Sequence, residues 1–405
     1  MKNLTLPFDL QKANEIAAQF PTPLYVYDEA GIRATTQQLM SAFDGVNGYT
    51  NYFAVKATPT PAILRILAEE GMGFDCSSAA ELELAKRLGV TGDRIFYTTN
   101  NTPKEDFERA IALGAIVNID DLTQVSVFTS CLKDGYPHAA VRYNPGSLKE
   151  GNAIIGTPTE AKYGMTLEQL PEAFKLLKAA GVKTFGLHTM VASNERDPAY
   201  FGETARILRE AADMVEKACD ITIDFLNLGG GFGLNYKLDE DELDLAATAH
   251  EIKTALQGSN RRVFTENGRF VTGPHGYLLT RVRYVMQKYK TYIGVDASMH
   301  NLMRPGMYGA YHHITVLGKE GSAATYDVVG SLCENNDKFA IDRNLPQIEP
   351  GDLLVVHDTG AHGHAMGFNY NGLLRSAEVL MRKDGTFELI RQAETIDDYL
   401  RNVIF

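Results

Sequence analysis

Three short stretches of the sequence carry groups that could do chemistry together. Lys56 lies near the end of the aromatic and apolar run NYFAVKATPT (51–60), just before a turn at Pro59. Three successive glycines, Gly229–Gly231, allow backbone N–H groups to approach an anion closely. Glu266, in FTENGR (264–269), adds a carboxylate. An amine, an anion-binding loop and a carboxylate in one place would suit pyridoxal 5′-phosphate, a phosphorylated cofactor that binds an amine covalently.

Two of these groups also have an ordinary structural explanation. Lys56 could be a solvated charge at the end of a strand, and the glycines could form a tight turn between a strand and a helix. Glu266 points more clearly to chemistry. At about 4 Å and an effective dielectric constant of about 20, a carboxylate attracts a protonated pyridine nitrogen by about 4 kcal/mol. A ring that is kept protonated in this way is a strong electron sink.

The elements that must position these groups alternate between strands and helices. Eight runs have the composition and alternation of strands, and segments with helical periodicity separate them. This rhythm is typical of a (β/α)8 barrel, with a doubly wound open sheet as the alternative. The expected strands cover residues 52–57, 73–76, 95–99, 115–120, 139–144, 185–190, 225–230 and 263–268.

A barrel of this kind carries its functional groups at the C-terminal ends of its strands. Polar or glycine residues fall at or just after six of the expected strand ends. They are Lys56, Asp75, Asn100, His188, Gly229–Gly231 and Glu266. This convergence favours a catalytic Lys56 over a solvated one.

The texture of the sequence changes after about residue 277. Short apolar runs divided by turn signals replace the helical segments, which predicts an all-β second domain. We therefore expect a cofactor-binding barrel over residues 24–276 and a β domain over residues 277–405. Residues 1–23 are expected to join the β domain.

Charge and composition exclude several classes of partner. The formal net charge is −12, from 39 basic and 51 acidic residues, so a nucleic-acid partner is not expected. The sequence has no apolar run of about 18 residues and no signal-peptide layout, which predicts a cytoplasmic protein that does not enter a membrane. Its four cysteines lack CxxC or zinc-type spacing, so we expect neither a disulfide framework nor a metal site.

Nine motifs, in order between about residues 23 and 385, resemble the barrel-type pyridoxal-phosphate-dependent amino acid decarboxylases, and among them the diaminopimelate decarboxylases. The motifs are YFAVKA, FDCSSAAELELA, RYNPG, GLHTMVASN, LNLGGGFG, ENGR, MRPGMYGAYH, SLCENNDKFA and DTGAHGHAMGFNYN. The resemblance implies a barrel followed by a β domain. It also implies a head-to-tail homodimer in which each subunit completes the active site of the other.

The resemblance also implies roles for individual residues. Lys56 corresponds to the lysine that binds the cofactor covalently, Glu266 to the partner of the pyridine nitrogen, and Cys333 to the proton donor after carbon dioxide leaves. The remaining cofactor contacts correspond to Asp75, His188, Met190, Ser193, Gly229, Gly230, Gly231, Asn267, Gly268, Arg269 and Tyr370, with Glu81 and Asn100 around the pocket. Glu334 would hold the distal amine of the substrate. Without the family, Cys333 could be a small buried apolar residue, Tyr370 could simply pack, and Asp75 could cap the helix that begins near Ser78.

The sequence departs from the family pattern after GLH. The family usually has a second histidine at the position of Met190, where its ring stacks on the cofactor, and a Gly-Ser pair where Ala192 and Ser193 stand here. Because residues 188 and 190 would share one face of a strand, we expect His188 to point inward below Met190 rather than replace it. A methionine sulfur against the ring would contribute about 0.3–1.5 kcal/mol.

The expected substrate follows from residues that match the family's binding site for a second carboxylate group. They are Arg269, Arg304 and Tyr308, which suggest meso-2,6-diaminopimelate, decarboxylated to L-lysine. Arg304 could instead be a structural ion-pair residue. The alternatives are a decarboxylase of D-lysine, D-ornithine or a carboxylated polyamine, an amino acid racemase, and a non-catalytic pyridoxal-phosphate carrier. Glu266 disfavours a racemase, since racemases of related fold usually place an arginine at the pyridine nitrogen.

Overall fold

In the computed structural model, residues 4–151 and 156–405 are described. They form two compact units. The barrel unit consists of Ala34–Leu234 and Glu242–Phe270. The β unit consists of the residues up to Arg33, Asn235–Asp241 and Val271–Phe405.

The barrel unit is a closed parallel barrel of eight strands, which confirms the predicted architecture. The last strand returns to the first through the pairs Thr50↔Phe264 and Asn51↔Thr265. The strands are β2 (Thr50–Ala54), β3 (Gly73–Cys76), β4 (Ile95–Thr98), β5 (Ile116–Ile119), β6 (Tyr136–Arg142), β7 (Val182–His188), β8 (Ile223–Asn227) and β9 (Arg262–Thr265).

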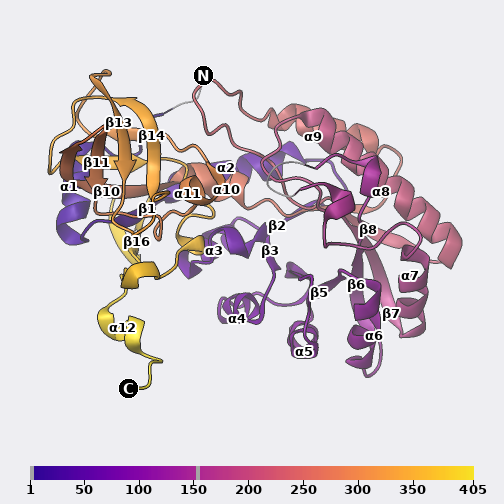
Figure 1. Ribbon diagram of the computed structural model, residues 1–405. Helices are drawn as coiled ribbons and strands as arrows, with labels where there is room; N and C mark the ends of the chain where they lie inside the picture. The colour runs from indigo at the N-terminus through magenta and orange to yellow at the C-terminus, as the bar shows by residue number, and fades with distance from the viewer. Residues whose placement is uncertain (1–3, 152–155) are drawn as a thin grey trace. The chain divides into compact units, whose positions relative to one another are not determined.

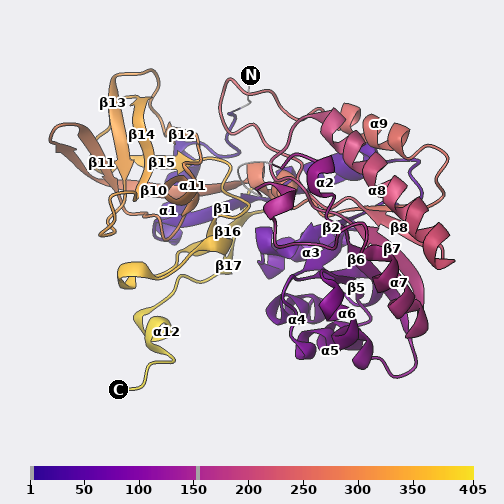
Figure 2. The same ribbon diagram turned by 45° about the vertical axis from the view of Figure 1, so that its right-hand side comes forward.

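Helices follow the strands and lie on the outside of the barrel (Figure 1 and Figure 2). They are α3 (Pro61–Glu69), α4 (Ala79–Arg87), α5 (Lys104–Ala112), α6 (Leu122–Ser130), α7 (Leu170–Ala179), α8 (Pro198–Cys219) and α9 (Leu245–Ala255). Helix α3 shows why they pack there, since it buries Ile63, Leu64, Ile66 and Leu67 on one face.

Glycines and capping residues set where these helices stop and start. Gly89, Gly114 and Gly181 follow α4, α5 and α7 with φ of 75°, 71° and 83°, the left-handed conformation that a β-carbon disfavours. The side chains of Ser78 and Asp121 accept backbone N–H groups at the starts of α4 and α6. The helices therefore end where these glycines allow the chain to turn toward the next strand.

Large side chains fill the interior of the barrel. The buried cluster contains Tyr52, Phe96, Ile116, Ala140, Phe225 and Phe264, one from each of six strands. The rings of Phe225 and Phe264 lie 4.7 Å apart, and those of Tyr52 and Phe264 lie 5.1 Å apart. The barrel is therefore a packed core and not a pore, so a ligand must bind at one of its ends.

The β unit contains a nine-stranded mixed sheet with the order β14-β13-β11-β10-β1-β16-β17, and β15 pairs with both β10 and β12. The strands are β1 (Leu24–Asp28), β10 (Gly276–Gln287), β11 (Thr291–Val295), β12 (Ile314–Val316), β13 (Ala324–Val329), β14 (Lys338–Leu345), β15 (Leu353–Val356), β16 (Ala377–Met381) and β17 (Phe387–Arg391). Helix α1 (Leu10–Gln19) packs on this sheet through Ala13 and Ile16.

Strand β1 belongs to the β unit, although the sequence analysis placed residues 24–28 in the barrel domain. It pairs with β10 on one side and β16 on the other. Leu24 and Val26 are fully buried in the apolar core of that sheet. This burial is the physical reason for the difference, because the short apolar run 24–28 finds its partners more than 240 residues further along the chain.

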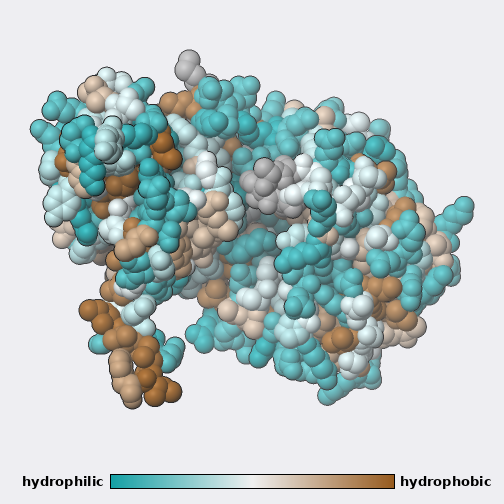
Figure 3. Space-filling view, in the orientation of Figure 1, coloured by the Kyte–Doolittle hydropathy of each residue, from teal (hydrophilic) through white to brown (hydrophobic). Residues whose placement is uncertain are grey.

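None of the helices in the described part of the chain is long and apolar enough to cross a membrane. Exposed apolar side chains gather instead at the C-terminal end, over α12 (Ile396–Leu400) and the residues that follow it (Figure 3). Ile396, Val403, Ile404 and Phe405 are all exposed.

Candidate active site

Lys56 lies just beyond the C-terminal end of β2, in a short 3-10 turn formed by Val55–Ala57. The expectation that the strand continues to residue 57 is wrong, because the chain turns after Ala54 toward Pro59. The turn leaves the Lys56 side chain exposed while its two neighbours, Val55 and Ala57, are buried. An exposed amine on a turn that packing holds at the barrel rim is available to a ligand.

Two acidic side chains near the end of β3 interact electrostatically with Lys56. Asp75 is 2% exposed, and burial, followed by the charge of Glu266, raises its pKa well above the usual value. Burial also raises the pKa of Glu81, whose carboxylate accepts the Ser77 N–H at 2.6 Å. Ser78 caps α4, so Asp75 is not the capping residue. Lys56 opposes both shifts, which places its positive charge close to these groups.

Glu266, directly after β9, is a buried carboxylate with a defined set of partners. His188 Nε2 donates to its Oε2 at 3.2 Å, and Asn227 Nδ2 donates to its Oε1 at 2.7 Å. Burial alone would raise the pKa of Glu266, but His188, Lys56 and Asn227 together lower it below the usual value. Glu266 is therefore anionic at neutral pH, as a partner for a protonated ring nitrogen must be.

The glycine loop after β8 is tightly packed against its neighbours. A β-carbon on Gly229 would lie 2.5 Å from the Thr189 carbonyl oxygen, and one on Gly230 would lie 2.5 Å from that of Glu266. On Gly231, with φ of 109°, it would lie 2.7 Å from the Ala192 oxygen. Only glycine fits at these three positions, so the loop presents bare backbone at the barrel rim.

Two asparagines fix this loop to the ends of the neighbouring strands. Asn227 Oδ1 accepts the Gly229 N–H at 2.9 Å, and Asn267 Oδ1 accepts the Phe232 N–H at 3.1 Å. Asn267 is held in turn by Asn51, whose Oδ1 accepts the Asn267 N–H at 2.8 Å. Next to it, a β-carbon on Gly268 would lie 2.8 Å from Ala57 Cβ, in the turn that carries Lys56.

The residues after GLH contact the glycine loop. Strand β7 ends at the fully buried His188, so the expectation that residues 188 and 190 share one strand face is wrong. Met190 lies in the following loop, where its Sδ accepts the Gly230 N–H at 3.2 Å. Ser193 Oγ accepts a hydrogen bond from Arg269 Nη2 at 3.4 Å. His188 and Met190 therefore do different things, since one contacts Glu266 and the other the glycine loop.

In the β unit, a second group of expected residues lies together. The loop between β13 and β14 carries Cys333 and Glu334, both exposed. Tyr370 hydrogen-bonds with Glu334, and this contact is the main reason why the pKa of Tyr370 is raised. Asn371 Nδ2 donates to Cys333 Sγ at 3.0 Å. The expected proton donor, the expected amine-binding carboxylate and the expected tyrosine thus form one cluster.

Arg304 and Tyr308 stand at the two ends of α11 (Arg304–Tyr308) and differ in their surroundings. Arg304 is 5% exposed, its Nη1 lies 2.9 Å from His312 Nε2, and its guanidinium lies 4.7 Å from the centre of the Tyr236 ring. Tyr308 is 53% exposed. The arginine is therefore held rigidly by aromatic side chains, whereas the tyrosine faces solvent.

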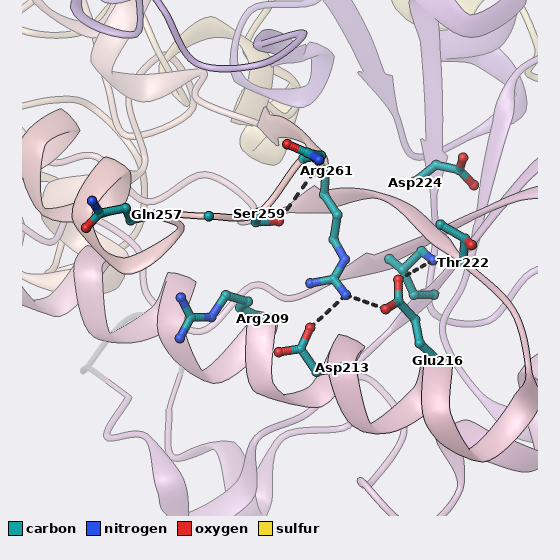
Figure 4. Close-up of a pocket in the computed structure, with 11 residues that line it drawn as sticks. Arg209, Asp213, Glu216, Thr222, Asp224, Gln257, Ser259 and Arg261 are labelled. Carbon is teal, nitrogen blue, oxygen red and sulfur yellow. Dashed lines mark hydrogen bonds and ion pairs between the residues drawn. The ribbon is translucent and has the colours of Figure 1, made fainter.

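The other end of the barrel carries an open pocket with no comparable chemistry (Figure 4). Residues that precede β8 and β9 line it together with α8. Arg261 Nη2 forms ion pairs with Asp213 and Glu216, each at 2.7 Å. Glu216 also accepts the Ile223 N–H at 2.8 Å. These contacts tie the N-terminal ends of the strands to α8, which is a structural role.

Sequence reasoning missed three residues that build the rim. Asn51 and Asn227 organise the glycine loop, and Arg142, at the end of β6, forms a buried ion pair with Asp120 at 3.1 Å. A usable signal existed for two of them, because Asn227 and Arg142 are polar residues at the ends of otherwise apolar strand runs. Asn51 lies at the opposite end of its run, and the partners that link it to the rim, Thr265 and Asn267, are more than 200 positions away.

The residues at the C-terminal rim fit pyridoxal 5′-phosphate. Within residues 4–151 and 156–405, the buried atoms Asp75 Oδ1, His188 Nδ1 and Asn267 Nδ2 have no hydrogen-bond partner. Unsatisfied buried polar atoms of this kind are rare and indicate a place for a polar ligand. An exposed amine, an anionic Glu266 and a glycine loop without side chains complete the set. Fold and site together define a barrel enzyme that binds a phosphorylated aldehyde cofactor.

The chain belongs to the pyridoxal-dependent decarboxylases: the family model described as "Pyridoxal-dependent decarboxylase, pyridoxal binding domain" matches residues 29–273. It is 41% identical to Protein TabA of Pseudomonas amygdali pv. tabaci, over 95% of this chain and 92% of that protein. It is 35% identical to the diaminopimelate decarboxylase of Methanothermobacter thermautotrophicus, over 96% of this chain and 93% of the relative.

Solved structures agree in fold and in class. The structure of diaminopimelate decarboxylase from Helicobacter pylori complexed with L-lysine superposes with a TM-score of 0.90 at 28% identity and covers 96% of this chain and 98% of that one. The protein is thus a pyridoxal-phosphate-dependent carboxy-lyase whose substrate is a small-molecule amino acid. The bound cofactor supplies the electron sink for the bond that breaks.

Proposed function

We propose that this protein decarboxylates meso-2,6-diaminopimelate at its D-configured carbon and releases L-lysine and carbon dioxide. The observation that carries the proposal is the similarity to diaminopimelate decarboxylases along almost the whole chain, such as 35% identity over 401 residues. The cluster of Cys333, Glu334 and Tyr370 in the β unit supports it, because it supplies an acid and an amine-binding carboxylate.

Each expected residue receives a task that its surroundings permit. Lys56 would hold the cofactor covalently through its side-chain amine. Glu266, kept anionic by His188 and Asn227, holds the proton on the ring nitrogen. The glycine loop, together with Asn267 and Gly268, binds the phosphate through its backbone, and Asp75, Met190, Ser193 and Arg269 surround the ring and phosphate. Cys333 gives a proton to the substrate carbon after carbon dioxide has left.

The distal end of the substrate is assigned to Arg304, Arg269 and Tyr308, with Glu334 for the distal amine. A guanidinium presents a planar fork that matches a carboxylate, and the contacts of Arg304 with His312 and Tyr236 fix its orientation. A substrate without a distal carboxylate would gain nothing from this arrangement. Arg304→Gln should therefore raise KM for diaminopimelate much more than it changes KM for a diamino acid that lacks that carboxylate.

A substrate panel tests the proposal directly. The purified, cofactor-loaded enzyme is given the meso, LL and DD isomers of diaminopimelate, and D- and L-lysine and ornithine, while carbon dioxide release is followed. We expect the meso isomer to be preferred and the product to be L-lysine. Faster turnover of lysine or ornithine than of diaminopimelate would overturn the assignment of the substrate but not the reaction class.

A second candidate is a related decarboxylase for a different amino acid. Two observations favour testing it: the identity to Protein TabA, 41%, exceeds the 35% to the diaminopimelate decarboxylase of Methanothermobacter thermautotrophicus, and Met190 occupies a position that is histidine in the family pattern. If the panel gives only weak turnover of meso-diaminopimelate, variants of that compound altered at the distal end are the next substrates to test.

The proposed active site is shared between two copies of the chain in a homodimer. A mixture of Lys56→Ala and Cys333→Ala subunits tests this arrangement, after dissociation and reassociation. Because random pairing leaves one intact site in each mixed dimer, about a quarter of the wild-type activity should return if the two residues come from different subunits. No recovery, with mixed dimers present by mass spectrometry, would place both residues in one subunit.

A further inference from the structure

In the β unit, a short turn contacts the loop that carries Cys333 and Glu334. The turn comprises Tyr370–Gly372, and the loop connects β13 to β14. Tyr370 hydrogen-bonds with Glu334, and Asn371 Nδ2 donates to Cys333 Sγ at 3.0 Å. The expected roles cover the tyrosine, the glutamate and the cysteine. Asn371 has no assigned role, although its side-chain amide donates to the Cys333 sulfur.

The backbone fixes the position of the Asn371 side chain. Asn371 has φ of 57° and ψ of 18°, a left-handed conformation that asparagine tolerates better than most residues. The turn is closed by the Gly372 N–H, which donates to the Asn369 carbonyl oxygen at 3.2 Å. Asn369 anchors it further, since its Nδ2 donates to Leu373 O at 3.0 Å and to Glu394 Oε2 at 2.7 Å.

The loop that carries Cys333 is held from its other side by Asp337. One carboxylate oxygen accepts the Leu332 N–H at 2.8 Å, and the other accepts the Met299 N–H at 2.6 Å. Asp337 is 3% exposed, and its own carbonyl oxygen accepts the Gly330 N–H at 3.1 Å. Since both the turn and the loop are anchored, the contact between Asn371 and Cys333 joins two rigid parts of the β unit.

We propose that Asn371 is a positioning residue for Cys333, whose side-chain amide orients the sulfur and stabilises negative charge on it. The proposal rests on the proposed role of Cys333 as proton donor. In that step the S–H bond breaks and its electron pair stays on sulfur. The proton forms a C–H bond with the electron pair that departing carbon dioxide leaves on the substrate carbon. An N–H donor aimed at the sulfur favours the charged product of this transfer, whereas the neighbouring carboxylate of Glu334 opposes it.

The experiment measures alkylation of Cys333 by iodoacetamide in the full-length holoenzyme between pH 6 and 10, with peptide mass spectrometry. Only the thiolate reacts, so the pH profile reports the charge on the sulfur. Cys131, partly exposed and remote from the turn in the sequence, serves as the internal reference. Asn371→Gly keeps the left-handed backbone but removes the amide, and Asn371→Asp keeps the shape but replaces the donor by a negative charge.

We expect the pH profile of Cys333 alkylation to move to higher pH in both variants, and further in Asn371→Asp. The pH profile of Cys131 alkylation should stay unchanged. The matched control is Asn336→Asp, which adds the same charge to the Cys333 loop at a residue whose amide donates to Gly306 O instead. It should shift the profile less than Asn371→Asp does. With the preferred substrate, kcat should fall in the Asn371 variants by about tenfold or more while KM changes little.

Unchanged alkylation profiles in both Asn371 variants would overturn the proposal. An equal shift in Asn336→Asp would do so as well, because the effect would then be one of charge alone. If Asn371→Gly does not fold, Asn371→Asp decides. The proposed role of Cys333 as proton donor fails separately if a Cys333→Ala variant still releases protonated product at the wild-type rate, and the proposed function fails separately in the substrate panel. Neither result changes the alkylation profile of the wild type.

Discussion

Two buried carboxylates at the rim of the barrel have opposite protonation tendencies. Burial raises the pKa of Asp75, whose Oδ1 has no hydrogen-bond partner in the described part of the chain. Glu266 is equally buried, but a histidine, a lysine and an asparagine lower its pKa. Groups whose environments separate their pKa values in this way usually divide the tasks of a site. Here the anionic carboxylate suits the ring nitrogen, and the carboxyl with the raised pKa retains a proton more readily and can then donate a hydrogen bond.

This difference predicts how stability responds to the removal of Asp75. A carboxyl whose pKa is raised in the folded state costs no stability below its unfolded pKa of about 3.9, and costs progressively more as the pH rises above that value. Asp75→Asn should therefore raise the free energy of unfolding of cofactor-free protein at pH 7, with little gain at pH 4. Urea unfolding at the two pH values measures it. A variant that is less stable at pH 7 than the wild type would contradict the assignment.

The sequence predicted most of the residues that the structure brings together at the barrel rim, but not the groups that hold them. Lys56, Glu266 and the three glycines were found because each interrupts a pattern, such as a charge after an apolar run. Asn51 was missed because its partners, Thr265 and Asn267, lie more than 200 positions away. The contact of Met190 with the Gly230 N–H was also missed, because the expected strand 185–190 ran two residues past His188, where β7 ends.

At the scale of elements, the glycine loop after β8 is the part of the barrel least tolerant of change. Gly229, Gly230 and Gly231 each lie against a backbone carbonyl oxygen, so an added methyl group cannot be accommodated by a side-chain movement. The loop must then move as a whole, and with it the N–H groups at the rim. Loops at the C-terminal ends of barrel strands carry function in this way while the strands below carry stability.

Gly230→Ala should therefore weaken the binding of pyridoxal 5′-phosphate by about tenfold or more, about 1.4 kcal/mol. Its β-carbon would lie 2.5 Å from the Glu266 carbonyl oxygen. The control is Gly258→Ala, at the end of α9, where φ is 83° but no atom lies within 4 Å of the added carbon. It should cost about 1 kcal/mol of stability through backbone strain and leave cofactor affinity unchanged. Fluorescence titration of the cofactor-free proteins compares them, and equal affinities would contradict the account of the loop.

The alternation of strands and helices was sufficient to predict the eight-stranded barrel, because each unit of the barrel is local in sequence. The β unit could be predicted only as a class. Its sheet joins β1 near the N-terminus to β10 and β16, and no local pattern specifies such distant pairing. The sequence boundary at residue 24 missed β1 for the same reason.

For the whole molecule, two histidines of the β unit, the buried His364 and the partly buried His275, predict acid sensitivity. Burial lowers the pKa of both His275 and His364 to about 4. The unfolded state, with a histidine pKa of about 6.5, then binds protons more strongly than the folded state below that pH. Each histidine therefore lowers the free energy of unfolding as the pH falls from about 6.5 to 4. The loss per histidine is about 3 kcal/mol, since its pKa differs by about 2.5 units between the two states and each unit corresponds to about 1.36 kcal/mol.

The test compares the free energy of unfolding of the wild type with that of His364→Gln and His275→Gln at pH 7, 5.5 and 4.5. Each variant should be less stable at pH 7 because a buried contact is lost, yet should lose less stability on acidification than the wild type does. Parallel pH dependence in all three proteins would contradict the expectation.

Every role proposed for the residues at the barrel rim requires Lys56 to be the covalent attachment point of the cofactor. Sodium borohydride, added to the purified holoenzyme, should fix pyridoxal phosphate irreversibly, and peptide mass spectrometry should find the added mass on Lys56 within residues 51–60. A stable label on another lysine, or no label on a protein that still decarboxylates its substrate, would contradict the central claim.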